Sequence, residues 1–384
     1  MNETWWVDPQ DLNDEQRAII ELPLKGSHLI TGPPGSGKTN LLLLRANYLT
    51  LADQPNIVIL VFTKTLQEFI ASGGTQYAFP SSRVQTVMKW EQGFLRSFGV
   101  TQEPPSEFHE KRMYYLVEIQ KLLATGKARA FYDAILLDEA QDYLPDEIRV
   151  FKQLGKVIFA TAHSKQKIYD GVDTTPLLES LTDEKHELHY HYRIGTKICR
   201  LADALVTGHD TELLLPTSNY DEDARPSSVE YIRCIDLEQE ASKIIERLAL
   251  QLRAYPDELL GIISPTRATA CLLWERLAEA ELAAIAVLQV SGEHSPFESH
   301  TRICVATVHA AKGLEFRALH VAECNQFEGK PHERNMMYTA ITRAKTSLSL
   351  YSSEPIPGYL EKALGTLTPK SELPNLAQVF GKQN

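Results

Sequence analysis

The sequence predicts an α/β fold with parallel β-sheets flanked by helices, and three features lead to this prediction. A glycine-rich loop at 32–39 lies between a strand-like apolar run and a leucine-rich helical run. Continuous runs of β-branched and other apolar residues at 57–62 and 134–137 are typical of strands buried on both faces of a parallel sheet. From residue 188 onward, strand candidates and helical segments alternate again. Because such alternation is typical of a parallel sheet with crossover helices, we expect a second α/β domain there.

Length and composition are those of a globular protein. The 384 residues, of which 43% are hydrophobic and 23% charged, suffice for about two to three domains. No apolar run reaches the roughly 18 residues of a membrane-spanning helix, and the N-terminus lacks the basic and apolar regions of a signal peptide. We therefore expect a cytoplasmic protein with no membrane partner.

The cysteines and the net charge narrow the function classes. The five cysteines form no C-x-x-C pair, so we expect reduced, mostly buried thiols rather than a zinc or iron–sulfur site. The net charge of −11 argues against nucleic-acid binding over the whole surface, because phosphate contacts require positive potential. A positively lined groove on an acidic protein is still compatible with this charge.

The helix expected to begin near Asn13 carries the first candidate binding residue. Asn13 is a favourable N-cap. The amide of Gln16 can pair with both the N6 and the N7 edge of adenine. Taken alone, an exposed helix glutamine is the better explanation of Gln16.

The loop at 32–39 has the G-x-x-x-x-G-K-T spacing of a P-loop. In such a loop, glycines allow backbone N–H groups to close around phosphates, the lysine reaches the outer phosphates and the hydroxyl binds Mg²⁺. The expected strand–loop–helix context is present. The candidate nucleotide-binding residues here are Gly32, Pro33, Pro34, Gly35, Ser36, Gly37, Lys38, Thr39 and Asn40.

The strand predicted at 57–62 ends next to Thr63. Since residues at the carboxyl ends of parallel strands face the ligand crevice, Phe62 and Thr63 can contact a bound molecule. For Phe62, a packed core aromatic is an equally good explanation. The region at 91–133 has little turn chemistry after Pro105, and we interpret it as a small helical insertion.

Two adjacent carboxylates follow the strand predicted at 134–137. Asp138 stands 100 residues after Lys38, and Glu139 comes next. Phosphoryl transfer requires this arrangement, with one carboxylate for Mg²⁺ and another to orient and deprotonate a water molecule. Two solvated acids are the alternative, and the upstream P-loop makes that alternative the weaker one.

A run at 157–161 predicts another strand, and we expect the first domain to end near the turn signal at Asp170 and Gly171. An acidic loop is expected at 177–187. We therefore place the first domain at 1–175, the second at 176–352 and a C-terminal tail at 353–384. The second half has a helix candidate at 196–206 and strand candidates at 188–193, 229–232, 260–263, 284–290, 303–308, 318–321 and 347–351.

Arg193 and Arg343 are candidate catalytic cations of the second half. A nucleotide held between two domains is hydrolysed fast only when positive charge reaches its γ-phosphate, and an arginine from across the cleft supplies that charge. For either arginine taken alone, a surface salt bridge is the better explanation.

In combination, these motifs resemble superfamily 1A helicases of the UvrD, Rep and PcrA type. The resemblance runs in order from Leu12 to about Tyr351, nearly the whole chain. It comprises Gln16, the P-loop, Phe62 with Thr63, the segments 138–142, 166–169 and 192–193, His309 with 312–316, and 342–344.

The resemblance implies two RecA-like P-loop NTPase domains with ATP and Mg²⁺ in the cleft between them and single-stranded DNA across the top. It implies that Gln16 reads adenine and Tyr192 stacks on it, while Lys38 binds phosphates and Thr39 and Asp138 hold Mg²⁺. It further implies that Glu139 is the general base, Gln166 senses the γ-phosphate and Arg193 and Arg343 are arginine fingers. Glu315 would meet the ribose, next to Gly313. The implied DNA-binding residues are Phe62, Thr63, Thr86, Trp90, Tyr169, Thr307 and His309.

The chain departs from this family in two ways. Family members carry a large insertion in each half, whereas here only 91–133 could form the first, and little room exists between about 282 and 305 for the second. A base-stacking aromatic of the family is replaced by Gly171. Stacking is worth roughly 1–3 kcal/mol per base, so Trp90 or Tyr169 would have to compensate.

Three functions follow as hypotheses. The leading one is a single-stranded-DNA-stimulated ATPase that moves 3′ to 5′ as a DNA helicase on single-stranded or 3′-tailed DNA, with a partner such as a nuclease in DNA repair or antiphage defence. The second is a nucleotide-switched subunit that senses DNA or a partner protein and unwinds little by itself. The third and weakest is an RNA helicase.

Overall fold

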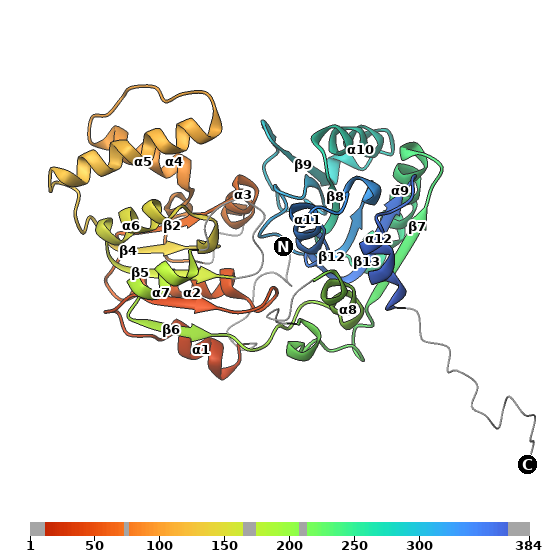
Figure 1. Cartoon of the computed structure of the whole chain (residues 1–384), viewed down its shortest axis with the longest axis horizontal. Helices are drawn as coiled ribbons and strands as arrows, with labels where there is room; N and C mark the ends of the chain where they lie inside the picture. The colour runs from red at the N-terminus through yellow and green to blue at the C-terminus, as the bar shows by residue number, and fades with distance from the viewer. Residues whose placement is uncertain (1–11, 73–76, 164–173, 207–212, 368–384) are drawn as a thin grey trace, which may run out of the picture.

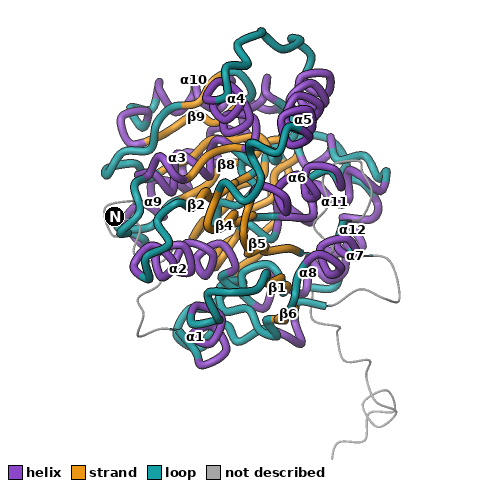
Figure 2. Tube along the Cα trace, turned by 90° about the vertical axis from the view of Figure 1, so that its left-hand side faces the viewer, coloured by secondary structure: helices purple, strands orange, loops and turns teal. Residues whose placement is uncertain are grey.

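The computed structural model describes residues 12–72, 77–163, 174–206 and 213–367. These residues form two α/β domains that lie side by side, with the amino-terminal half in one and the carboxyl-terminal half in the other (Figure 1). In both domains the strands lie in the interior and the helices cover them (Figure 2). This arrangement confirms the predicted α/β class with parallel sheets flanked by helices.

The first sheet has six strands in the order β3-β2-β4-β5-β1-β6, and every neighbouring pair is parallel. All five side chains of β2 are buried, as expected for an apolar strand with helices on both faces. The strands are β1 (His28–Thr31), β2 (Ile57–Val61), β3 (Val84–Thr86), β4 (Tyr132–Leu137), β5 (Gly155–Ala162) and β6 (Glu184–Glu187).

Seven helices of the described chain accompany this sheet. Asn13 caps the first of them through a capping box with Gln16, as the sequence predicts. The region at 91–133 contains the rest of one helix and a second long one, packed against each other and against the sheet through a shared apolar cluster. The helices are α1 (Asp14–Ile20), α2 (Lys38–Leu51), α3 (Lys64–Ser72), α4 (Val87–Ser97), α5 (Phe108–Ala124), α6 (Pro145–Leu154) and α7 (Thr175–Leu181).

The second sheet has seven strands in the order β10-β9-β11-β8-β12-β13-β7, parallel except for the short β10. Its core is formed by apolar side chains of the strands and of the long helices α9 and α10. The elements are α8 (Thr196–Leu205), β7 (Ser228–Arg233), α9 (Leu237–Ala254), β8 (Leu260–Ser264), α10 (Arg267–Glu279), β9 (Ala286–Val290), β10 (Glu293–His294), β11 (Ile303–Thr307), β12 (Phe316–Val321), α11 (Pro331–Ile341), β13 (Ala344–Ser352) and α12 (Gly358–Gly365).

The segment between the domains differs from the expectation. The acidic loop predicted at 177–187 contains part of α7 and the whole of β6, so the first sheet extends beyond residue 175. The strand predicted at 188–193 is absent, and only an isolated bridge joins His191 to Ser218 there. The charged side chains of Glu184–Glu187 do not resemble a strand in the sequence. An edge strand tolerates them because one of its sides does not have to be covered by apolar residues.

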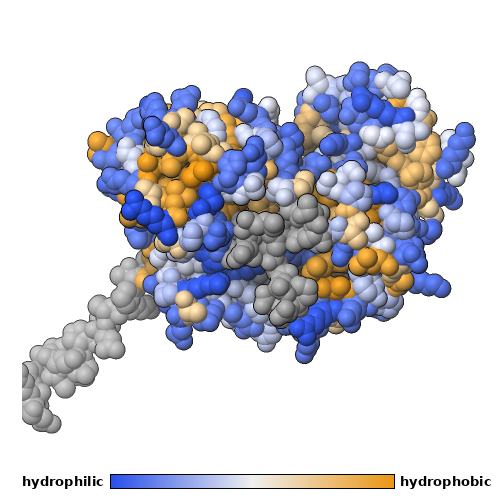
Figure 3. Space-filling view, turned by 180° about the vertical axis from the view of Figure 1, so that it is seen from behind, coloured by the Kyte–Doolittle hydropathy of each residue, from blue (hydrophilic) through white to orange (hydrophobic). Residues whose placement is uncertain are grey.

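The two domains touch through the helix that follows β2. Phe69 of α3 packs edge-on against Phe297, with ring centroids 5.4 Å apart and an interplanar angle of 84°. Thr65 donates a hydrogen bond from Oγ1 to Gln289 Oε1 at 3.2 Å. Beside these contacts a notch separates the domains on the rear face (Figure 3).

None of the helices in the described part of the chain is both long and apolar enough to cross a membrane. All five cysteines are free thiols, and four of them are buried. Burial raises the pKa of the Cys199 thiol to about 12. These observations agree with the expectation of reduced, mostly buried cysteines.

Candidate functional site

The P-loop joins the end of β1 to the start of α2. Gly35 and Gly37 have φ angles of 75° and 88°, in the left-handed region that glycine adopts without strain. A Cβ at Gly32 would lie 2.8 Å from Leu188 Cβ. The loop therefore needs glycine at these positions. It leads into the N-terminus of α2, where backbone N–H groups and the helix dipole favour the binding of an anion.

Lys38, the first residue of α2, points back over the loop. Its Nζ donates to the carbonyl oxygens of Gly32 at 2.7 Å and Pro33 at 2.8 Å. Burial lowers the pKa of Lys38 to about 8, although the nearby Glu139 and Asp138 carboxylates act in the opposite direction. Lys38 therefore remains mainly protonated at neutral pH and can neutralise phosphate oxygens.

Thr39 and Asp138 meet where α2 faces the end of β4. The Thr39 hydroxyl donates to Asp138 Oδ2 at 3.1 Å, and Thr161 Oγ1 donates to Asp138 Oδ1 at 2.8 Å. Burial, reinforced by the charge of Glu139, raises the pKa of Asp138 to about 6. A hydroxyl and a buried carboxylate fit Mg²⁺, which prefers oxygen ligands.

Glu139 follows at the turn after β4, with φ at 49°. A non-glycine residue in this left-handed conformation is uncommon and occurs often at functional sites. Gln141 donates a hydrogen bond from its side-chain amide to Glu139, and Lys312 Nζ lies 3.6 Å from Glu139 Oε2. Burial acts to raise the pKa of Glu139, but Lys312, Lys38 and Arg343 outweigh it and lower the pKa to about 2. Glu139 is therefore ionised at neutral pH.

The second domain and the segment that precedes it supply cations opposite the P-loop. Arg193 Nη1 pairs with Glu315 Oε2 at 2.8 Å, and Lys345 Nζ lies 3.6 Å from the same oxygen. Arg343 is 6% exposed and donates from Nε to the Thr339 carbonyl at 3.2 Å. Neither arginine is therefore an ordinary surface cation.

These groups enclose a narrow cleft between the domains. Its volume is about 40 Å³. The structure thus brings together most of the nucleotide-binding residues predicted from the sequence. The lining residues are Pro34, Gly35, Gly37, Lys38, Thr39, Asn40, Glu139, Arg193, Gly313, Glu315 and Arg343.

Gln16 and Tyr192 flank the P-loop. Gln16 is 8% exposed and donates from Nε2 to the Ser36 carbonyl at 3.2 Å, which excludes the exposed-glutamine alternative. The side-chain amide of Asn13 donates to the Tyr192 hydroxyl. Sequence reasoning assigns Asn13 only a capping role, whereas its amide also joins α1 to the segment that carries Arg193.

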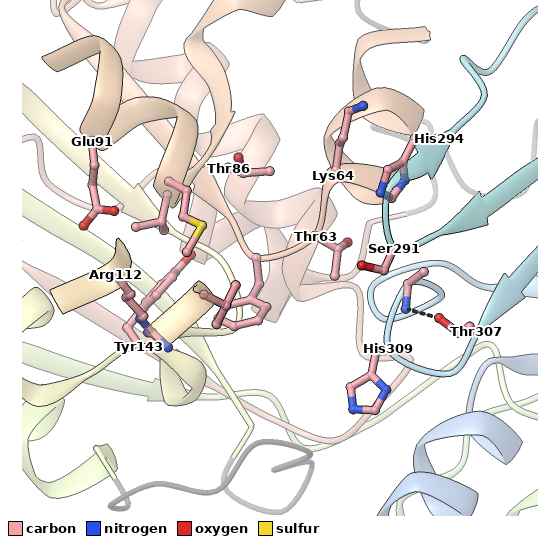
Figure 4. A pocket seen from close by; sticks show the side chains of 15 residues that line it. Thr63, Lys64, Thr86, Glu91, Arg112, Tyr143, Ser291, His294, Thr307 and His309 are labelled. Atoms are coloured by element: carbon pink, nitrogen blue, oxygen red, sulfur yellow. Dashed lines mark hydrogen bonds between the residues drawn. The ribbon is translucent and has the colours of Figure 1, made fainter. Parts of the chain in front are cut away.

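A second pocket, of about 400 Å³, lies where α3 and α4 face the second domain. Figure 4 shows Thr63, Lys64 and Thr86 across this space from Ser291, His294 and His309. Five of the seven predicted DNA-binding residues line this pocket. They are Phe62, Thr63, Thr86, Thr307 and His309.

The lining of this pocket suits a flexible aromatic ligand. Val87, Met88 and Tyr143 supply apolar surface, and Phe108 at the start of α5 is 57% exposed. Such surfaces can stack on or pack against bases, because every base has an apolar face. The hydroxyl and imidazole groups around the rim can donate hydrogen bonds.

Trp90 does not belong to this pocket, and the prediction that it contacts DNA is corrected. It is 2% exposed, its Nε1 donates to the Tyr132 hydroxyl at 3.0 Å, and it packs against Phe94 and Phe151. A side chain buried in this way is a core element. The predictions for Gln166, Tyr169 and Gly171 lie outside the described residues.

Lys312 joins the two pockets, and sequence reasoning missed this role. Its side chain is 1% exposed and forms ion pairs with Asp142 and, at 3.6 Å, with Glu139. Its carbonyl oxygen accepts a hydrogen bond from Thr63 Oγ1 at 3.1 Å. One residue of the second domain thus contacts both the acidic turn after β4 and the rim of the larger pocket.

Comparison with known proteins gives one family match. Residues 302–351 match the family model of the UvrD-like helicase C-terminal domain. No curated protein sequence matches the chain significantly. The matched segment holds β11, β12, α11 and most of β13, and it carries Lys312, Glu315 and Arg343.

Two similar solved structures are helicases by their descriptions. The C-terminal domain of a possible DNA helicase from Lactobacillus plantarum WCFS1 has 21% identity and a TM-score of 0.34, over 46% of this chain and 96% of that one. The helicase of PRRSV has 14% identity and a TM-score of 0.39, over 88% of this chain and 54% of that one. The family match thus shows that residues 302–351 are similar to the UvrD-like helicase C-terminal domain.

Proposed function

We propose that the chain is a DNA-stimulated ATPase that moves 3′ to 5′ along single-stranded DNA. One observation carries this proposal. The nucleotide cleft and the larger pocket are each lined by residues of both domains, and Lys312 contacts one lining residue of each, Glu139 and Thr63. A change in the distance between the domains therefore alters both sites at once. The direction of movement rests on the resemblance of the sequence motifs.

The residues of the chain divide the work on ATP as follows. The P-loop backbone and Lys38 hold the phosphates, Gln16 pairs with the adenine and Tyr192 stacks on it. Thr39 and Asp138 would hold Mg²⁺, which when bound would supply neutralisation of phosphate charge and polarisation of the transferred phosphoryl group. Arg193 and Arg343 bring positive charge from across the cleft, which can accelerate phosphoryl transfer by orders of magnitude.

Glu139 acts on the attacking water. As an ionised carboxylate it accepts a hydrogen bond from that water and orients it toward the γ-phosphate. Its low pKa makes it a weak proton acceptor while Lys312, Lys38 and Arg343 surround it. Lys312 belongs to the second domain, so opening of the domains removes a cation from Glu139.

The decisive experiment is steady-state ATP hydrolysis with and without single-stranded DNA. We expect stimulation of the wild type by DNA, and loss of turnover in Lys38→Ala, Glu139→Gln and Arg343→Ala. An RNA strand of equal length serves as the comparison, and stronger stimulation by RNA would favour the RNA-helicase alternative. If Arg343→Ala bound ATP and kept full turnover, the two-domain cleft would be the wrong catalytic unit.

A second candidate function is a nucleotide-switched sensor that works with a protein partner. The connection between α10 and β11 favours it, because this connection holds only the short strands β9 and β10 and one turn of 3₁₀ helix at 283–285 and leaves no inserted subdomain. We would expect DNA-stimulated hydrolysis with little strand separation. Unwinding of a 3′-tailed duplex by the purified chain at catalytic concentration would exclude this candidate.

A further inference from the structure

Three potential metal ligands meet at the edge of the first sheet, and none of them is a residue that the proposed function uses. The edge strand β6 lies beside β1, as Figure 2 also shows. His28 of β1 is paired in register with Glu184 of β6, and His186 stands two residues further along β6. Because alternate residues of a strand share a face, all three side chains lie on the same face of the sheet.

The distances among the three ligand atoms are those of a metal site. His28 Nδ1 lies 3.4 Å from His186 Nε2 and 3.7 Å from Glu184 Oε2, and His186 Nε2 lies 3.4 Å from the same glutamate oxygen. With ligand bonds of about 2.0–2.1 Å, tetrahedral coordination places neighbouring ligand atoms about 3.3 Å apart. One nitrogen from each histidine and one carboxylate oxygen therefore lie at separations that one metal ion could bridge.

The exposure of the three ligands also suits a cation. His28 is 3% exposed, whereas the side chains of His186 and Glu184 are 26% and 58% exposed. An ion can therefore enter from the solvent side and bind to a fixed inner ligand.

Arg45 is the charge that opposes cation binding here. Its guanidinium is held by three backbone carbonyls, those of Ile20, Leu22 and Pro23. The Glu184 carboxylate brings one negative charge into the cluster at contact distance and offsets this repulsion.

We propose that His28, Glu184 and His186 form a site for a divalent transition-metal ion, of which Zn²⁺ fits best. Two imidazoles and one carboxylate are a familiar zinc ligand set, and they leave the fourth position to water. Imidazole ligands disfavour Mg²⁺ and Ca²⁺, which prefer oxygen.

The bound ion would fasten β6 to β1. Among the described strands β6 pairs with β1 and stands at the edge of the sheet, and the chain runs from it directly into Leu188, Tyr192 and Arg193. The other end of β1 leads into the P-loop. The ion would therefore stabilise the strand that precedes Tyr192, which the proposed function assigns to adenine stacking, and Arg193, which lines the cleft.

Zinc titration of the tag-free protein tests this site. Isothermal titration calorimetry is performed with Mg²⁺ in excess, so that Thr39 and Asp138 are occupied, and the visible absorption of bound Co²⁺ reports the ligand set. We expect one Zn²⁺ per chain, a higher unfolding temperature with Zn²⁺, and binding at least about tenfold weaker in His186→Ala and Glu184→Gln.

His189→Ala is the matched control, because His189 lies in the same segment, is exposed and pairs with Glu15 instead. This variant should bind Zn²⁺ as the wild type does. Equal Zn²⁺ affinity in His186→Ala and wild type would overturn the proposal, and so would the lack of stoichiometric binding by the wild type. In that case the cluster would be a hydrogen-bonded His–His–Glu group. None of these readouts depends on ATP hydrolysis, so the outcome is separate from that for the proposed function.

Discussion

The acidic turn after β4 shows how single residues set the chemistry of the cleft. Asp138 and Glu139 are adjacent and buried, yet their pKa values move in opposite directions. Glu139 lies near Lys312, whereas the Asp138 carboxylate accepts hydrogen bonds from the hydroxyl groups of Thr39 and Thr161. Their different environments make Asp138 suited to hold a cation and Glu139 suited to orient water. Pairs of acids with different roles are commonly distinguished by their environments in this way.

Trp90 gives the first prediction at this scale. Trp90→Phe removes the hydrogen bond to Tyr132 while keeping an aromatic ring in the core. We expect the free energy of unfolding in urea to fall by about 1 kcal/mol or more, because a net hydrogen bond and some packing are lost. The affinity for a fluorescent single-stranded oligonucleotide should not change. A loss of affinity that exceeds the loss of stability would restore Trp90 as a DNA contact.

At the scale of elements, the contact between α3 and the loop before β12 sets how closely the domains approach. Gly313 has φ at 88°, and a Cβ there would lie 2.6 Å from Leu66 Cδ2 on α3. Gly292 has nearly the same φ, at 85°, but a Cβ there would meet no atom of the described residues within 4 Å. The two glycines therefore share the backbone requirement and differ in the contact.

Gly313→Ala should therefore hold the domains apart, and Gly292→Ala should not. In both variants the alanine must adopt the left-handed backbone conformation, which costs about 1–2 kcal/mol of free energy. We expect the turnover of Gly313→Ala to fall by about tenfold, equivalent to about 1.4 kcal/mol, and that of Gly292→Ala to stay near the wild type. Equal turnover of the two variants in a steady-state assay would show that the Leu66 contact does not limit closure.

The packing of α9 against the end of β12 gives a prediction of pH dependence. Glu240 of α9 is fully buried, and its Oε2 accepts a hydrogen bond from the Glu323 backbone N–H at 2.9 Å. Burial raises its pKa from 4.5 to about 7. The folded state therefore holds a proton that the unfolded state releases, and stability should fall as pH rises from about 4.5 to about 7.

Glu240→Gln should remove this part of the pH dependence, since glutamine keeps the acceptor oxygen and carries no charge. Thermal unfolding measured across this pH range should show a smaller decline for the variant than for the wild type. Parallel declines would mean that Glu240 is ionised in the folded protein.

The features that the sequence predicts best are those determined by residues close together in the chain. The P-loop spacing fixes the positive φ angles of Gly35 and Gly37, and the apolar run of β2 fixes a strand buried on both faces. The burial of Trp90 was within reach of the sequence, because Trp90 and Phe94 are four residues apart on one helix face.

Contacts between distant segments were beyond the sequence. Lys312 and Asp142 are 170 residues apart, and His28 and His186 are 158 apart. No local pattern relates such pairs, because the order of strands in the sheet decides which of them become neighbours. β6 was missed for the same reason, since its residues are charged and only its pairing with β1 makes it a strand.

At the scale of the whole molecule, the edge-on contact between Phe69 and Phe297 is one of the contacts that join the two domains. Both side chains are at least nine-tenths buried. Phe297→Ala removes the edge-on contact, which is worth about 0.5–1.5 kcal/mol beyond the buried area. We expect a more open molecule with a larger radius of gyration by small-angle X-ray scattering. Phe131→Ala is the control, because Phe131 lies in the first domain and is 44% exposed. An unchanged radius for Phe297→Ala would show that other contacts suffice for closure.

The position of Lys312 between the two pockets has a thermodynamic consequence. A residue that both sites touch couples their occupancies, and such a coupling free energy is reciprocal by necessity. If a DNA strand in the larger pocket tightens ATP binding by some factor, ATP must tighten strand binding by the same factor. The affinity of the chain for the DNA strand would then rise when ATP binds and fall when the nucleotide leaves, without any dedicated signalling element.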